Sequence, residues 1–154
     1  MPIRFQLLRS EDLPMACQLI AEAAEWSPKS QLFDNPMDTL LRPRSQWMSA
    51  LSGEELLGII GFHDISLPDS SAEMFTGIVP KWRGKGFAAN LVTQQLDFAF
   101  KDMGLRRITM TCLEGSPSAK IADKMKVPLE GRFVRSRLKR GVYHDSLAYG
   151  LERT

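Results

Sequence analysis

The apolar positions of this chain recur with two different periods, and each period predicts a different kind of element. In the first third of the chain a helical period predicts a helix that follows Ser10, which we expect to cap it, and that ends near residue 24. Its predicted apolar stripe is Leu13, Cys17, Ile20 and Ala24. Residues 26–43 lose the period and contain three prolines, so we expect a loop region with at most a short helix. Short apolar runs predict strands over residues 3–8, 46–51, 56–65 and 72–79.

The second half begins with the clearest helical period in the chain, from Phe87 to Met103, with Gly104 directly after it. A strand is expected over residues 105–113, then a short helix from Ser116 or Ser118 to Lys126, and a final hairpin of residues 133–138 and 142–151. This order predicts an α+β domain spanning residues 1–154, with a single mixed, mostly antiparallel seven-stranded sheet flanked by about four helices.

Composition adds limits on the class of protein. An apolar fraction of 44% and a charged fraction of 25% are typical of a soluble globular domain. We see no apolar run of the ~20 residues that span a bilayer, and no secretory signal, so we expect no membrane association and a cytoplasmic location. Cys17 and Cys112 lack the spacing of metal ligands, and we expect no metal site.

Charge is unevenly distributed. Residues 1–79 hold 5 Lys and Arg against 11 Asp and Glu, whereas residues 80–154 hold 15 against 7. A basic half suits a phosphate-bearing ligand and an acidic half suits a cationic substrate, although two segregated solvated faces would give the same counts.

The stretch from Ile78 to Ala88 carries the most specific chemistry. A predicted strand ends at Val79, a basic loop with Gly84 and Gly86 follows, and a helix starts near Phe87. Glycines allow close approach of the backbone to a ligand, and a helix N-terminus attracts anions. With Arg83 and Lys85 adding positive charge, the loop suits a pyrophosphate, although a plain surface turn could have the same composition. The spacing matches neither the P-loop nor the dinucleotide-binding fingerprint.

The same stretch resembles the GCN5-related N-acetyltransferase (GNAT) family, whose signature [R/Q]-x-x-G-x-[G/A] is matched by Arg83, Gly86 and Ala88. The order of elements is also similar over nearly the whole chain. The resemblance implies a GNAT fold and acetyl-CoA as co-substrate, with the pyrophosphate held by Gly84, Lys85, Gly86, Phe87 and Ala88. It further implies that Ile78 and Val79 pair with the pantetheine amides.

The C-terminal half is more similar to the branch that contains ribosomal-protein alanine and serine acetyltransferases, through residues 118–125, 130–132 and 143–149. It departs from the usual pattern at three places, one of which is Lys126-Val127 where a Gly-Phe pair usually follows the helix. Gly115 stands where the branch has an asparagine, and Ala122 where many members have the tyrosine that acts as general acid. These departures leave open the acceptor, the identity of the acid and whether the chain is catalytic.

Acyl transfer to an amine needs a base, an acid and a stabilised oxyanion. Glu73, on the strand that leads to the loop, is the first candidate for the base, and His63 beside Asp64 is its rival. Resemblance to the ribosomal-protein branch suggests Ser118 as the acid, although a capping role or a CoA contact would also suit it. A backbone N–H near Val79 is the candidate oxyanion donor. The aromatic residues that could line an acceptor pocket are Trp26, Phe33, Trp47 and Phe62.

We therefore expect an N-acetyltransferase that acts in a ternary complex on a primary amine, either a protein N-terminus or a small cationic amine. A GNAT-like protein that binds acyl-CoA without catalysis is one alternative. A nucleic-acid-binding module is another, motivated by the basic segment Arg132 to Arg140, but we do not expect a nucleic acid as partner. A homodimer through the terminal strands would cover an exposed sheet edge.

Overall fold

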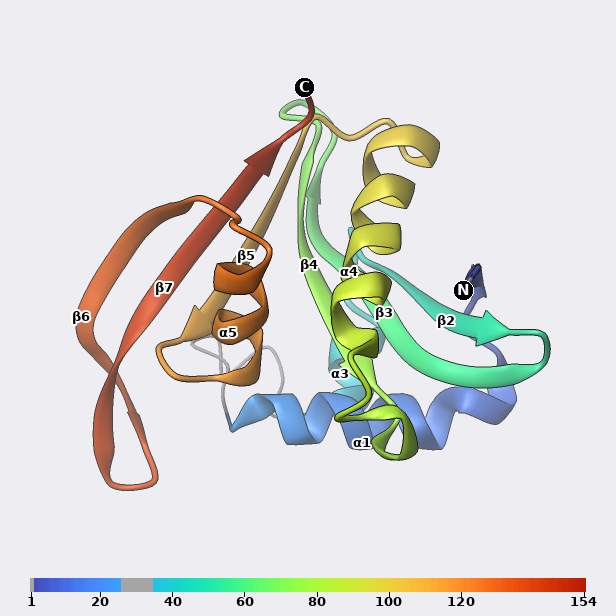
Figure 1. Cartoon of the computed structure of the whole chain (residues 1–154), viewed down its shortest axis with the longest axis horizontal. Helices are drawn as coiled ribbons and strands as arrows, with labels where there is room; N and C mark the ends of the chain where they lie inside the picture. The colour runs from blue at the N-terminus through green and yellow to red at the C-terminus, as the bar shows by residue number, and fades with distance from the viewer. Residues whose placement is uncertain (1, 26–34) are drawn as a thin grey trace.

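Seven strands form one sheet in the order β1-β2-β3-β4-β5-β7-β6 in a computed structural model that describes residues 2–25 and 35–154 (Figure 1). Every neighbouring pair is antiparallel except β4 and β5, so the predicted α+β class with a mixed, mostly antiparallel sheet is confirmed. The strands are β1 Arg4–Leu7, β2 Gln46–Ser52, β3 Glu55–Ser66, β4 Ser71–Ile78, β5 Arg107–Leu113, β6 Leu129–Lys139 and β7 Val142–Glu152.

The parallel pair β4–β5 is short. Its register joins Ser71 to Arg107, Ala72 to Ile108 and Glu73 to Thr109, whereas β4 continues to Ile78 and β5 to Leu113. Figure 1 shows the two strands meeting near the C terminus and separating toward the end of the sheet that carries helix α1. The sheet therefore splits between its fourth and fifth strands.

Helices cover both faces of the sheet. The described helices are α1 Leu13–Ala24, α3 Pro36–Leu40, α4 Phe87–Asp97, which continues as a π-helical turn Phe98–Asp102, and α5 Pro117–Lys124. Side chains of α4 pack against Ala72 and Met74 of β4, and those of α1 pack against Phe75 on the other face. In the described part of the chain, no helix has the length and apolarity needed to cross a lipid bilayer.

The structure of α1 corrects the expected cap and part of the expected apolar stripe. Ser10 lies in a 3₁₀ turn, Ser10–Asp12, and its side chain caps no helix. The buried residues of α1 are Ala16, Leu19 and Ile20. Ile20 of the predicted stripe is therefore confirmed, whereas Leu13, Cys17 and Ala24 are only half-buried.

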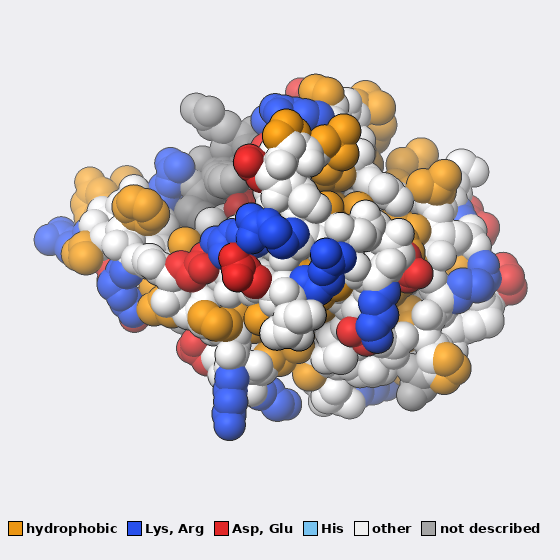
Figure 2. All heavy atoms as spheres, turned by 90° about the horizontal axis from the view of Figure 1, so that it is seen from above, with side chains coloured by type: hydrophobic (Ala, Val, Ile, Leu, Met, Phe, Trp, Pro, Cys, Tyr) orange, Lys and Arg blue, Asp and Glu red, His pale blue; other side chains and the backbone are white. Residues whose placement is uncertain are grey.

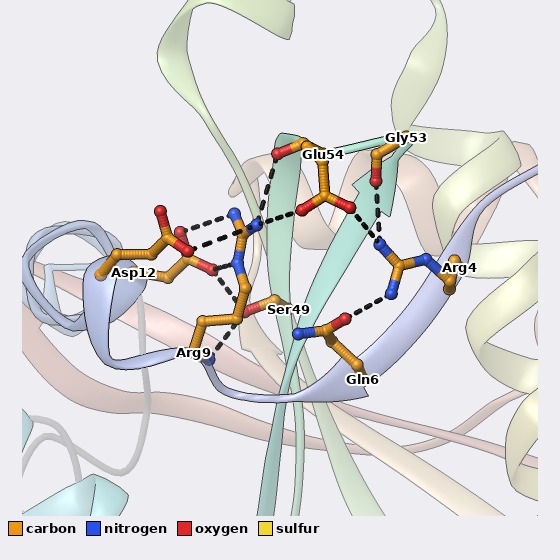
Figure 3. A network of polar contacts seen from close by, with 8 residues as sticks. Arg4, Gln6, Arg9, Asp12, Ser49, Gly53 and Glu54 are labelled. Carbon is orange, nitrogen blue, oxygen red and sulfur yellow. Dashed lines mark hydrogen bonds and ion pairs between the residues drawn. The ribbon is translucent and has the colours of Figure 1, made fainter.

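A polar network fastens the N-terminal segment to the β2–β3 hairpin (Figure 3). Asp12 is buried and accepts hydrogen bonds from Arg9 Nε at 2.6 Å and from Ser49 Oγ at 2.7 Å. Arg4 donates to the Gly53 carbonyl at 2.9 Å and pairs with Glu54 at 3.3 Å. Asp12 thus holds the start of α1 against strand β2.

The β6–β7 hairpin departs from regular alternation. The register shifts between Phe133 and Arg137, and Arg135 adopts a left-handed conformation with φ 48°. In a regular strand, alternate residues of the basic segment Arg132 to Arg140 would share one face. The register shift interrupts that face at its centre.

Candidate functional site

The loop between β4 and α4 has the conformation that its glycines allow. Gly84 and Gly86 have φ of 73° and 72°, and a Cβ added at either would meet no atom within 4 Å. The two glycines are therefore required by the left-handed backbone rather than by lack of space. Gly86 is the N-cap residue of α4, and no side chain in the described ranges caps that helix. The first amides of α4 are thus available to an anion, in an exposed loop.

Arg83 braces this loop against two other elements. Its Nε donates to the Ile78 carbonyl at 3.0 Å, and its Nη2 donates to Glu22 Oε2 of α1 at 2.6 Å. The hydrogen bond from Arg83, and a second one from Gln18, hold the pKa of Glu22 below its usual value. A phosphate contact by Arg83 remains a prediction.

Two lysines surround the aromatic residue of the loop. The Nζ atoms of Lys81 and Lys85 lie 5.4 Å and 5.3 Å from the centre of the Trp82 ring, and Lys81 also pairs with Glu55 at 2.9 Å. Lys85 thus lies in the loop between the two left-handed glycines, where a lysine side chain suits an anion site.

The backbone hydrogen bonds at the end of β4 correct the prediction for Val79. The N–H of Val79 donates to the Leu57 carbonyl of β3 at 3.0 Å, and the Val79 carbonyl accepts from Trp82 N at 2.9 Å. Val79 therefore directs its backbone groups to β3 and to the following turn, which argues against Val79 as a pantetheine partner, while a backbone N–H near Val79 as oxyanion donor remains a prediction. Because hydrogen-bonding sides alternate along a strand, Ile78 and Thr76 direct their backbone groups toward β5 instead. The prediction for Ile78 agrees with this direction.

At the point where β4 and β5 separate, Glu73 belongs to a buried cluster of polar side chains. Thr111 Oγ1 of β5 donates to Glu73 Oε1 at 3.0 Å. The other carboxylate oxygen, Oε2, lies 3.3 Å from His63 Nε2, and His63 Nδ1 lies 3.1 Å from Asp64 Oδ2. Glu73 and His63 are 7% and 2% exposed, whereas the Asp64 side chain is 44% exposed. The two rival candidates for the base therefore form one unit.

The aromatic surroundings of this cluster were partly predicted. Trp47 stacks on His63 with ring centres 6.5 Å apart and packs against Phe75 at 5.3 Å. Its flat approach depends on Gly61, where a Cβ would lie 2.4 Å from the indole. Phe62 belongs to the core on the α4 face, so its predicted place in an acceptor pocket is wrong. Trp26 and Phe33 lie outside the described residues.

Helix α5 lies on the opposite face from Glu73, over the side chains of Cys112 and Tyr149. Ser116, not Ser118, is the cap, because Ser116 Oγ accepts from Ala119 N at 3.3 Å. Ser118 is exposed in the first turn of α5, so its role as acid remains a prediction.

The buried groups under α5 are protonated at neutral pH. Burial raises the pKa of the Cys112 thiol to about 11, and burial together with the hydrogen bond to Asp123 raises the pKa of Tyr149 to about 12. The Tyr149 hydroxyl donates to Asp123 Oδ1 at 2.8 Å. Ala122, also buried here, leaves no acid at its own position.

Two participants escaped the sequence analysis: Thr111, and Glu22 as the partner of Arg83. Asp64 was named beside His63, but its contact with Nδ1 was not predicted. Thr111 could have been found, because it follows Thr109, the register partner of Glu73, by two residues on the same face of β5. The contact between Glu22 and Arg83 joins residues 61 positions apart, which no local pattern reveals.

Two of the five basic side chains in the segment Arg132 to Arg140 pair with acidic side chains that the structure describes, and two others have different partners. Figure 2 likewise shows Lys and Arg side chains lying beside Asp and Glu on the face seen from above. Arg135 lies over the Tyr143 ring at 5.6 Å. The other contacts join Arg132 to Asp145 and Glu114, Arg140 to Glu25, and Lys139 Nζ to the Ala24 carbonyl. Nothing in this pairing favours a nucleic-acid partner.

Comparison with known proteins bears on both the fold and the loop. Residues 3–126 match the family model described as an acetyltransferase (GNAT) domain. The prophage-derived N-acetyltransferase YokL of Bacillus subtilis is 21% identical over 117 residues, which are 75% of this chain and 66% of YokL. The spermidine N(1)-acetyltransferase of Vibrio cholerae is 28% identical over 60% of this chain and 54% of its own length. The chain thus spans about half to two thirds of these relatives.

Solved structures agree with the fold. Spermidine N-acetyltransferase from Vibrio cholerae in complex with CoA and spermine superimposes with a TM-score of 0.80 at 20% identity, covering 97% of this chain and 95% of that one. A chimera of the Vibrio cholerae enzyme SpeG and hSSAT gives a TM-score of 0.79 at 23% identity, with coverage of 99% and 96%. The predicted fold is confirmed, while the nearer similarity to the ribosomal-protein branch stays a prediction.

Proposed function

This chain belongs to the GNAT acetyltransferase family, and from that premise we propose that it transfers an acetyl group from acetyl-CoA to a primary amine by direct attack in a ternary complex. The relatives with which it shares sequence are named N-acetyltransferases.

The observation that carries the proposal is the split between β4 and β5, with an anion site at one end and a buried carboxylate at the other. The uncapped start of α4 and the Gly84–Gly86 turn lie where β4 ends, and Glu73 lies where β4 leaves β5. A ligand with a pyrophosphate and a long, amide-containing arm matches this layout. The pyrophosphate would bind the loop, and the arm would pair with the backbone of Thr76 and Ile78.

Glu73 serves as the base in this scheme. Its carboxylate takes a proton from the acceptor ammonium, and the neutral amine then attacks the thioester carbonyl. Thr111 donates a hydrogen bond to one carboxylate oxygen, which fixes the orientation of the base, and His63 Nε2 lies 3.3 Å from the other. A carboxylate has further lone pairs that remain for the acceptor.

Ser118 is the proposed acid for the leaving thiolate. It lies on α5, on the face of the sheet opposite Glu73, so a thioester placed in the split would have the base on one side and α5 on the other. Tyr149 is a weaker candidate because its hydroxyl proton is donated to Asp123.

We propose a small cationic amine of the polyamine class as the acceptor. Glu73 and Asp64 place two carboxylates on one face of the sheet, which favours a ligand with more than one ammonium group. One relative is named for spermidine. A protein N-terminus, as the ribosomal-protein resemblance suggests, is the alternative acceptor.

The proposal is tested by calorimetric titration with acetyl-CoA, followed by release of free CoA thiol with spermidine or with a peptide that begins with alanine. We expect saturable binding and thiol release with spermidine above that with the peptide. Binding without turnover on any amine would show the non-catalytic alternative. No binding of acetyl-CoA would contradict the proposal.

We also propose that the chain forms a homodimer through the β6–β7 hairpin. β6 is an edge strand, and Phe133, Val134, Val142 and Tyr143 are each more than half exposed. A patch of this kind on an unpaired edge favours association with a second copy. Light scattering should give twice the monomer mass, and Val134→Glu should restore the monomer.

A further inference from the structure

The environment of His63 is unusual because both ring nitrogens face carboxylates. The contact from Nδ1 to Asp64 Oδ2 is 3.1 Å long with hydrogen-bond geometry, whereas the contact from Nε2 to Glu73 Oε2 is a longer ion-pair contact of 3.3 Å. A neutral imidazole carries one N–H and can donate to one of the two carboxylates, while an imidazolium donates to both. The His63 ring, which lies between Asp64 and Glu73, can therefore take up one additional proton.

The backbone is bent to bring Asp64 to this position. Asp64 has φ 50°, a left-handed conformation that costs a non-glycine residue energy, and the β3–β4 register shifts between His63 and Ser66. In a regular strand Asp64 would point to the face opposite His63. The bulge turns its carboxylate back onto Nδ1, and strain of this kind is concentrated at functional sites.

We infer that His63 and Asp64 are positioning residues that act through Glu73 by storing the proton that Glu73 takes from the acceptor. Before reaction the imidazole is neutral, its Nδ1–H donates to Asp64, and its unprotonated Nε2 faces Glu73. The ammonium gives a proton to Glu73, and that proton moves on to Nε2. The amine is then neutral, Glu73 is ionised again, and the imidazolium donates one hydrogen bond to each carboxylate.

The amine loses a second proton as the amide forms, and this proton replaces the one that Ser118 gives to the leaving thiolate. The stored proton returns through Glu73 to water after the acetyl group has moved, so the two protons lost by the ammonium group are both accounted for. Asp64 stabilises the stored state because its charge lies against the imidazolium. The benefit is that a buried carboxylate can accept a proton from an ammonium group without itself remaining neutral. This inference rests on the proposed function, which makes Glu73 the base.

The first test does not depend on turnover. The chain has two histidines, so the ring ¹⁵N and N–H signals of His63 can be assigned by comparison with His144→Gln. We expect a neutral ring protonated at Nδ1, with its N–H signal shifted downfield by Asp64, and loss of that shift in Asp64→Asn. Asparagine tolerates the same left-handed backbone, so the bulge is retained. A ring protonated at Nε2 would overturn the inference, whatever amines the protein acetylates.

The second test measures kinetics. Asp64→Asn should lower kcat about tenfold, less than loss of a direct proton-transfer group, and should raise KM for the amine, because its carboxylate is one of the two proposed to attract the acceptor. The solvent deuterium isotope effect on kcat should increase. Asp69→Asn is the matched control, because Asp69 lies in the β3–β4 turn and bonds Ser66 Oγ at 2.9 Å, away from His63.

Asp64→Gly separates the carboxylate from the backbone, because glycine relieves the left-handed strain while removing the side chain. We expect it to lose kcat as Asp64→Asn does. Wild-type kcat and isotope effect in both Asp64 variants would overturn the inference. Wild-type protein with the expected tautomer but no acetylation of amines would instead overturn the proposed function.

Discussion

The Gly84–Gly86 loop and the Glu73 cluster lie at the two ends of the same strand segment and are built in opposite ways. The loop is exposed, continuous in sequence and made of backbone groups, with two left-handed glycines ahead of an uncapped helix. The cluster is buried and made of side chains from β3, β4 and β5. A backbone site tolerates changes that keep its φ angles, whereas a side-chain cluster fails when one member is changed.

This difference predicts that binding and turnover can be separated by mutation. Variants of the loop should change affinity for CoA and leave the chemical step intact. Variants of the cluster should change turnover and leave CoA binding intact.

The largest effect is expected from Glu73→Gln. Removing the base should lower kcat about 100-fold and shift the pH profile of kcat, since proton transfer by a positioned group contributes roughly 10²–10⁴. The affinity for acetyl-CoA, measured by calorimetry, should stay within about twofold of wild type because the loop is unchanged. Equal losses of kcat and of CoA affinity would show that the two regions are not separable.

The second effect is expected from Arg83→Glu, which places a carboxylate beside Glu22 and removes the donor to the Ile78 carbonyl. We expect the affinity for CoA to fall about 30-fold, roughly 2 kcal/mol, from like-charge repulsion and loss of the loop brace. This loss should far exceed that of Glu73→Gln.

Arg106→Glu is the matched control for that variant. The Arg106 and Arg83 side chains are 49% and 47% exposed, and Arg106 makes one ion pair, with Glu152 at 2.9 Å. We expect it to bind CoA as wild type does. A similar loss in both variants would point to general charge rather than to the loop.

The same contrast explains which features of the molecule could be predicted from the sequence. The loop from Arg83 to Ala88 was predictable because its signal is local: glycine spacing, basic residues and a helical period that starts at Phe87. The succession of strands and helices along the chain was predictable because alternation and turn residues mark most strands, and the crossover helix predicts one parallel pair.

The cluster was predictable only in part, because its members meet through sheet register and a bulge. Glu73 and His63 were candidates, but the pairing that makes them one unit is the β3–β4 register, in which the two residues are opposite each other. The left-handed conformation at Asp64 occurs at a residue other than glycine, so the sequence contains no glycine signal for it. Ser10 failed as a cap because Asp12 is held by Arg9 and Ser49, a tertiary contact that overrides the local preference.

A third, smaller effect concerns Asp12, which contacts neither region. Burial pushes the pKa of Asp12 up, but the hydrogen bonds from Arg9 and Ser49 outweigh burial and hold the pKa below the reference value of 3.8. The resulting stability is present above that value and is lost as the pH falls through the folded-state pKa. Asp12→Asn should therefore lower the free energy of unfolding by about 2 kcal/mol at pH 7 and by less below pH 3.

Urea unfolding at pH 7 and below pH 3 measures the difference in the free energy of unfolding between Asp12→Asn and wild type, with Glu11→Gln as control. Glu11 also pairs with Arg9, at 3.6 Å, but its side chain is 72% exposed, so we expect a change below about 0.5 kcal/mol. A difference for Asp12→Asn that is the same at both pH values would contradict the assignment.

The smallest effect on stability compares the two serines of α5. Ser116→Ala removes the cap bonded to Ala119 N and should destabilise the protein by about 1 kcal/mol, whereas Ser118→Ala should change stability by less than about 0.5 kcal/mol because Ser118 is exposed. If Ser118 is the acid, its variant should lower kcat several-fold at unchanged CoA affinity, which would place it with Glu73 in the side-chain region of the site. Weaker CoA binding at unchanged kcat would instead assign Ser118 to the cofactor site. In that case a side chain of α5 would contribute to CoA binding, and binding would not depend on backbone groups alone.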